Sequence, residues 1–168
     1  DLKLIMRILL IPSSDYLGHP FPQRHNHIFE RLNKLKNFEV HVLQFNIFRT
    51  KTLNTSCIIH ELPNEIKISN KTMLYYLSNL PHFCAYIRRI ILREGIDIVV
   101  AGNLAPPLAY MLTKTLTKDK IPIVFDLQDH YPSSATGYIV NVTSISGKLF
   151  MAGFESLLKY IIKNVKKL

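Results

Sequence analysis

The chain of 168 residues, with a mass of 19.4 kDa, has the size of one ordinary domain and can bury a substantial core. Hydrophobic residues make up 48% of it and charged residues 20%, with a mean hydropathy of +0.11, and these values exclude a disordered chain. Six glycines and nine prolines exclude a collagen-like or linker-like composition, and no apolar run approaches the roughly 20 residues that span a bilayer.

The formal net charge of +9 is the strongest compositional signal. It fits an anionic partner, which could be nucleic acid, anionic lipid or a phosphorylated ligand, and it equally fits a soluble protein with a basic surface. Aromatic and basic residues do not alternate as they do in RNA-binding sheets, so we expect no nucleic acid partner.

Only two cysteines occur, Cys57 and Cys84, and both lie in apolar stretches. They predict free buried thiols in a reducing compartment, with no disulfide and no metal site of the C-x-x-C kind. The first strand starts naturally at Met6, so we interpret residues 1–5 as sequence upstream of the natural start. The apolar run that follows is too short for a signal peptide, which predicts a cytoplasmic protein.

Short apolar runs alternate with amphipathic segments along the chain. The runs predict strands at residues 8–11, 39–45, 57–62, 96–101 and 122–127. Apolar stripes at helical spacing predict helices at residues 22–36, 70–94, 106–116 and 147–167. Within the second helical segment, a new helix is expected to begin near Pro81. Gly95 is expected to cap the end of that segment.

This alternation of strands and helices predicts an α/β fold with a doubly wound parallel sheet, a Rossmann-like three-layer α/β/α sandwich that occupies residues 1–168 as one domain. The strands at 8–11, 96–101 and 122–127 are expected to be neighbours. Ligands of such sheets bind beyond the carboxyl ends of the strands, where the strand order reverses. The loop after the first strand, the turn at Asn103 and the loop after Leu127 are therefore expected to form one rim.

Polar residues in these loops are candidates for chemistry. The loop of residues 13–19 leads into a helix, whose N-terminus can bind phosphate, but it lacks the G-x-G-x-x-G pattern and is equally readable as a surface connection. Asp126, Asp129 and His130 cluster after the fifth strand, where carboxylate and imidazole groups could exchange protons or a carboxylate could act as a cap. Arg24 and His25 start the first helix near the same rim.

The segment around residues 75–93 mixes apolar and aromatic residues with Arg88, Arg89 and Arg93. It could contact an anionic membrane peripherally, at the inner face. We favour the alternative of a packed crossover helix with a solvated basic face.

Four segments together resemble the N-terminal, acceptor-side domain of GT-B fold glycosyltransferases of the large retaining group called family 4. Residues 6–11 look like the opening strand of that family, and residues 23–32 resemble its first helix, which often carries an Arg near its start. Residues 38–43, FEVHVL, are similar to its second strand. Residues 96–100 and 121–132, IDIVV and IPIVFDLQDHYP, are similar to its D-h-V-h and P-h-V-x-x-h-x-D-x-x-P segments.

The resemblance implies a hexosyltransferase that moves a sugar from a nucleotide-sugar donor to a glycan or lipid-linked acceptor. It implies no tightly bound cofactor and no metal. It also implies a C-terminal donor-binding domain of the same protein, without which this chain is expected to be inactive. The site residues implied are Asp129 and Gln128 for catalysis, Ser13, Ser14 and Gly18 for the donor phosphate, and Tyr16, His19, Arg24, Asn103 and His130 for the acceptor.

Phe38 departs from the small-polar pair that precedes the second strand in the family, and two further departures bear on the chemistry. Ser13 and Ser14 stand where family members usually carry a glycine pair, and Gln128 stands where many carry a histidine. Two other functions stay open: a non-catalytic, flavodoxin-like ligand-binding module, and part of a GT-B epimerase acting on nucleotide sugars.

Overall fold

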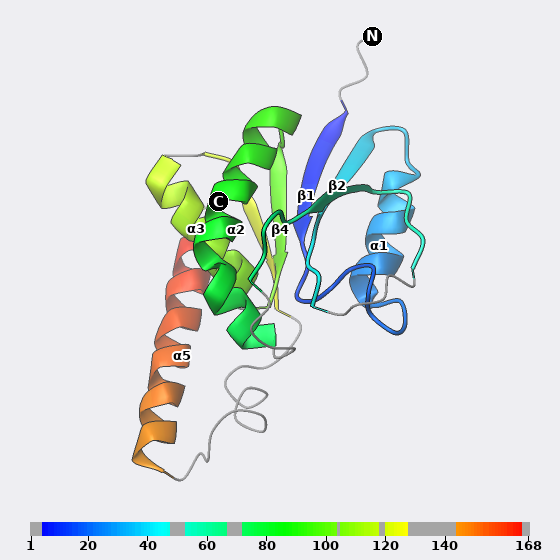
Figure 1. Ribbon diagram of the computed structural model, residues 1–168. Helices are drawn as coiled ribbons and strands as arrows, with labels where there is room; N and C mark the ends of the chain where they lie inside the picture. The colour runs from blue at the N-terminus through cyan, green and yellow to red at the C-terminus, as the bar shows by residue number, and fades with distance from the viewer. Residues whose placement is uncertain are drawn as a thin grey trace.

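The computed structural model describes residues 5–47, 53–66, 72–103, 105–117, 120–127 and 144–165. Its centre is a parallel sheet of five strands in the order β3-β2-β1-β4-β5 (Figure 1). The strands are β1 (Met6–Ile11), β2 (Phe38–Gln44), β3 (Ile58–Glu61), β4 (Ile98–Gly102) and β5 (Ile123–Asp126). Each falls within one of the predicted apolar runs or within two residues of it, and β1, β4 and β5 are neighbours as predicted.

Helices cover both faces of this sheet, as a doubly wound fold requires. They are α1 (Arg24–Asn33), α2 (Thr72–Glu94), α3 (Ala105–Thr117) and α5 (Ile145–Val165). Of the helices that the structure describes, Figure 1 shows α1 on one face and α2, α3 and α5 grouped on the other. The three-layer, Rossmann-like α/β architecture predicted from the sequence is therefore confirmed.

Alternate residues of the strands enter the two cores. Ile8 and Leu10 of β1 pack with Phe29 of α1, whereas Leu9 and Ile11 pack with Ile87 of α2. A strand buried on both faces needs a continuous apolar run, and this is why β1 carries no polar residue after Arg7.

The prediction that a new helix begins near Pro81 is wrong, because α2 continues through this proline without a break. Proline lacks the N–H group of a helical hydrogen bond, so tertiary packing must offset this loss. Aromatic rings from both sides of the proline supply that packing: Tyr76 and Phe83 lie 5.0 and 5.1 Å from the ring of Phe45. Breaking the helix at Pro81 would separate these rings.

Gly95 ends α2 as predicted, in the left-handed conformation with φ +63°. Its N–H donates to the carbonyl of Ile91 at 3.1 Å, which closes the last turn. A Cβ at this position would also lie 3.3 Å from a guanidinium nitrogen of Arg7.

The environments of Gly95 and Gly153 predict that a change from glycine to alanine has opposite effects on the free energy of unfolding at the two positions. Gly95→Ala should lower the free energy of unfolding by about 1–2 kcal/mol, because alanine is strained at positive φ. Gly153→Ala in α5, where a Cβ meets nothing within 4 Å, should raise it by about 0.5–1 kcal/mol. Urea denaturation of both variants measures the two changes, and equal signs would contradict the assigned backbone at Gly95.

Candidate functional site

The carboxyl ends of β1 and β4 meet at the point where the strand order reverses, since β1 leads outward to β2 and β4 leads outward to β5. This is where open parallel sheets bind their ligands. Ser13 and Ser14 follow β1, Asn103 follows β4, and Asp126 ends β5. We call the edge formed by these residues and by Arg24, at the start of α1, the rim.

The loop after β1 is held by a buried carboxylate. Asp15 is 1% exposed and accepts hydrogen bonds from the backbone N–H of Gly18, at 2.8 Å, and from the side-chain amide of Gln44. The carbonyl oxygen of that same amide accepts the N–H of Leu17 at 3.0 Å. A Cβ at Gly18 would overlap the Asp15 carboxylate, so the turn requires glycine there.

This turn changes what the predicted phosphate loop can offer. The N–H groups of Leu17 and Gly18 already donate to Gln44 and Asp15 inside the protein. Gly18 therefore shapes the loop and does not present a vacant N–H group. Ser13 and Ser14 are half-buried at the end of β1, and the Ser14 hydroxyl donates to the side chain of Gln23 at 3.1 Å.

The start of α1 is joined to this loop by Asn26. Its side-chain oxygen accepts the N–H of Gln23 at 2.8 Å, and its side-chain nitrogen donates to the carbonyl of Tyr16 at 3.0 Å. Helix and loop therefore form one hydrogen-bonded unit, which fixes where Arg24 and His25 lie.

Asp126 binds both residues at the start of α1. The ring nitrogen Nε2 of His25 donates to one carboxylate oxygen at 2.7 Å, and the guanidinium of Arg24 pairs with the other. His25 is 2% exposed, whereas the Asp126 side chain is 22% exposed and Arg24 lies at the surface. The arrangement is a carboxylate at the rim, held in place from one side by a buried imidazole and from the other by an exposed cation.

The protonation of His25 follows from this burial. Desolvation lowers the pKa of His25 below its ordinary value of 6.5, and the hydrogen bond to Asp126 opposes this effect only in part. A neutral imidazole with its proton on Nε2 satisfies the observed contact, because the carboxylate can only accept.

Asn103 stands at the reversal point in a conformation unusual for its type, with φ +57°. Its backbone N–H donates to the carbonyl of Asp126 at 2.9 Å, which ties the ends of β4 and β5 together. Its side-chain oxygen is buried and is the one such side-chain N or O atom in the described part of the chain without a hydrogen-bond partner. A buried acceptor of this kind is costly to leave unpaired, so it indicates that a donor is recruited there.

Two of the residues predicted to bind the acceptor are positioned differently from the rim residues. Tyr16 is 2% exposed, and its hydroxyl donates to Glu30 of α1 at 3.0 Å, so the side chain packs into the core and does not line the rim. His19 is half-buried, and its Nδ1 donates to the carbonyl of Phe21 at 3.0 Å. The structure thus brings Ser13, Ser14, Arg24 and Asn103 to the rim region.

Gln128, Asp129 and His130 lie outside the described residues. The described rim contains Asp126 and His25, which the resemblance to the family did not assign to the site. A signal for them exists in the sequence, because an Asp ends the fifth strand and an Arg-His pair opens the first helix. Their direct contact spans a hundred residues and could not be inferred from spacing.

Other reactive groups do not gather at the rim. Cys57 is buried and Cys84 half-buried, both are free thiols, and burial raises the pKa of Cys57 to about 11. Such thiols are poor nucleophiles at neutral pH. Among the described ranges, no three His, Cys, Asp or Glu side chains are grouped so that they could hold a metal ion. None of the helices in these ranges has both the length and the apolar character required to cross a membrane.

Comparison of the sequence with models of protein families and with curated proteins finds no match.

The buried state of His25 predicts how stability depends on pH. Below pH 6.5 the unfolded chain binds a proton on His25 before the folded protein does, so the free energy of unfolding falls as the pH decreases. His25→Gln keeps a donor to Asp126 but cannot titrate. It should reduce the slope of stability against pH between about 5 and 6.5 by up to about 1.4 kcal/mol per pH unit.

Urea denaturation across this range measures the slope. Three carboxyl groups have lowered pKa values, and they change the free energy of unfolding mainly below their ordinary pKa of 4.5. These groups are Glu30, Glu39 and Glu94. The slope between pH 5 and 6.5 is therefore due mainly to histidines. His27→Gln, on the exposed side of the same helix, is the matched control for a change from histidine to glutamine. If both variants change the slope alike, His25 is not the titrating group.

Proposed function

We propose that this chain is the acceptor-side domain of a glycosyltransferase, which transfers a sugar from a nucleotide-sugar donor to a glycan or lipid-linked acceptor. Two lines of evidence support the proposal. The fold is the Rossmann-like sheet that the resemblance implies, and its rim carries polar groups suited to hydroxyl-rich ligands.

The observation that carries the proposal is the unpartnered oxygen of Asn103. It lies at the reversal of strand order, beside the backbone of Asp126. A sugar hydroxyl is a donor of the right kind, because it can give its proton to this oxygen and accept a hydrogen bond from a neighbour. A buried oxygen of this kind takes its hydrogen bond from a ligand or from ordered water, and a sugar hydroxyl can replace such a water.

The Asp126 carboxylate adds a second acceptor for hydroxyl groups. Held by His25 and Arg24, it keeps a fixed orientation toward the rim and needs little rearrangement when a ligand binds. Arg24 is exposed and carries a charge that can also meet a phosphate group.

Retaining transfer without an obvious nucleophile would depend on positioning the acceptor hydroxyl and on stabilising the leaving phosphate. In this proposal the rim binds and orients the acceptor. The donor would be held mainly by the second domain that the resemblance implies, and Ser13 and Ser14 are the residues that the resemblance assigns to its phosphate. The implied roles of Asp129 and Gln128 in catalysis remain part of the proposal.

The proposal predicts weak binding of donors by this chain alone. Calorimetry with UDP-glucose and GDP-mannose should show no binding or dissociation constants no tighter than about millimolar, because most donor contacts come from elsewhere. Sub-micromolar affinity for a nucleotide sugar would contradict the proposal. Sub-micromolar affinity for flavin mononucleotide would favour a self-contained, flavodoxin-like binding module.

Asn103→Gly separates binding from stability. Glycine accepts the positive φ at this position and removes the unpaired oxygen, so the free energy of unfolding should stay equal or rise by up to about 1 kcal/mol. NMR titration of the unchanged protein with a panel of free glycans should shift the amide signals of Gly102 and Asp126. These shifts should disappear in Asn103→Gly. A variant that loses stability and keeps these shifts would make Asn103 a structural residue.

A further inference from the structure

A polar cavity lies between β3 and the last turns of α2 and shares no residue with the rim. It has a volume of about 160 Å³ and is lined by His60, Pro63, Tyr86, Arg89, Ile90 and Arg93. We call it the α2 pocket. A water molecule occupies about 30 Å³ in the liquid, so this pocket has room for an ion of a few heavy atoms with some of its waters.

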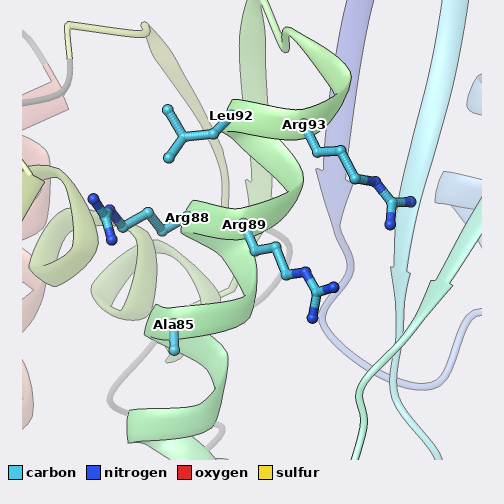
Figure 2. A pocket seen from close by; sticks show the side chains of 5 residues that line it. All are labelled: Ala85, Arg88, Arg89, Leu92 and Arg93. Carbon is cyan, nitrogen blue, oxygen red and sulfur yellow. The ribbon is translucent and has the colours of Figure 1, made fainter.

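Two arginines form one side of the α2 pocket. Arg89 and Arg93 are four residues apart on one helix, and this spacing places them one above the other. Figure 2 shows both side chains projecting from the same side of α2, while Arg88 and Leu92 project from the other side. A separate open hollow of about 420 Å³ is lined by Ala85, Arg88, Arg89, Leu92 and Arg93, and it shares only Arg89 and Arg93 with the α2 pocket.

Positive charge is poorly compensated here. In the described part of the chain, Arg88 and Arg89 form no ion pair, and Arg93 pairs through Nε with Glu94 at 2.6 Å. That contact leaves the two terminal nitrogens of Arg93 outside the pair. Like charges four residues apart destabilise a helix slightly, so two arginines at this spacing are better explained by an anion that both can bind.

The opposite wall of the α2 pocket holds His60, which His41 contacts from behind, inside the protein. His60 is buried, and its Nε2 lies 2.9 Å from Nδ1 of His41. Nε2 of His41 donates to Glu39 at 3.1 Å, and Glu39 also accepts from Arg7 at 2.9 Å. Nε2 of His41 carries the proton that is donated to Glu39, so Nδ1 of a neutral His41 can only accept a hydrogen bond. In the neutral pair, Nε2 of His60 therefore donates to Nδ1 of His41.

A further proton on this pair would place positive charge at the pocket wall. Burial lowers the pKa of His60 below its ordinary value of 6.5, and the neighbouring His41 and Arg93 lower it further, while Glu94 opposes them. An anion in the pocket would raise this pKa, so binding and protonation would strengthen each other. The charged or titratable groups around His60 are His41 and Glu39 on β2, Arg7 on β1, Glu61 on β3, and Tyr86, Arg89, Arg93 and Glu94 on α2.

We propose that the α2 pocket binds a phosphate group, with Arg89 and Arg93 as its cationic ligands and His60 as a proton-dependent third contact. Arginine matches the geometry of phosphate oxygens with two parallel donors, which lysine cannot do. The phosphate could belong to a soluble ion or monoester, or to the headgroup of an anionic lipid such as phosphatidic acid. The proposal does not depend on the glycosyltransferase assignment, because none of these residues belongs to the rim.

Inorganic phosphate is the direct probe. NMR titration of the whole chain should shift the ring signals of His60 and raise its pKa relative to the phosphate-free protein. Arg89→Gln should weaken phosphate binding by about tenfold or more, since a charge-assisted contact is lost. Arg88→Gln removes the same charge from the next residue, on the other side of the helix, and should weaken binding by less than about twofold.

This pair of variants decides the matter. Equal losses in Arg88→Gln and Arg89→Gln would show that phosphate responds to general surface charge and would overturn the pocket, as would titration without any change in the His60 signals. Both arginines are exposed, so neither variant should unfold the protein, and urea denaturation checks this.

Vesicles identify the source of the phosphate. Sedimentation with phosphatidylcholine vesicles that contain phosphatidic acid, lost in Arg89→Gln and retained in Arg88→Gln, would assign a lipid headgroup. Phosphate binding that depends on Arg89, with no sedimentation, would assign a soluble ligand. If neither phosphate nor these vesicles bind, the proposal is wrong.

Discussion

Burial of β1 on both faces and both edges is the constraint on which the rest of the structure depends. Its residues Leu9 and Leu10 are fully buried, and it pairs in parallel with β2 on one edge and β4 on the other. Parallel neighbours must be reached by crossover connections, and helices therefore lie on both faces of the sheet. The loop after β1 consequently emerges at the reversal of strand order, beside the end of β4, where a ligand can approach several strands at once.

The rim residues are held in fixed positions by hydrogen bonds of buried polar side chains next to them. Asp15 and Gln44 satisfy each other and the backbone of the first loop, and Asn26 joins that loop to α1. The position of α1 then places His25 and Arg24 against Asp126, which lies at the end of β5 and far from them in the sequence. The contacts of Asp15, Gln44, Asn26 and His25 satisfy polar side chains that would otherwise be buried at a cost in free energy, so they restrict the arrangement of the rim.

The sequence was sufficient to predict the elements and their order along the chain. Apolar runs such as residues 8–11, and the glycine at position 95, form strands and helix ends for local physical reasons. It failed where distant packing decides. Pro81 suggests a helix start, but the rings of Tyr76, Phe83 and Phe45 keep one helix intact. Tyr16 suggests a surface contact, but Glu30 and the core enclose it. The pairing of His25 with Asp126 depends on the sheet order, which no local pattern contains.

The two polar sites of this chain call for different chemistry. At the rim the exposed cation Arg24 is paired with Asp126, and the unpartnered group among the described residues is the neutral oxygen of Asn103, which is why the proposed ligand there is a hydroxyl donor. On α2 the situation is reversed, since Arg89 has no acidic partner in the described part of the chain. Salt screens surface charges beyond about 10 Å, so long-range attraction cannot select a ligand. Selection of the proposed phosphate on α2 would therefore come from short contacts to both arginines and His60, and selection of the proposed acceptor at the rim from hydroxyl geometry.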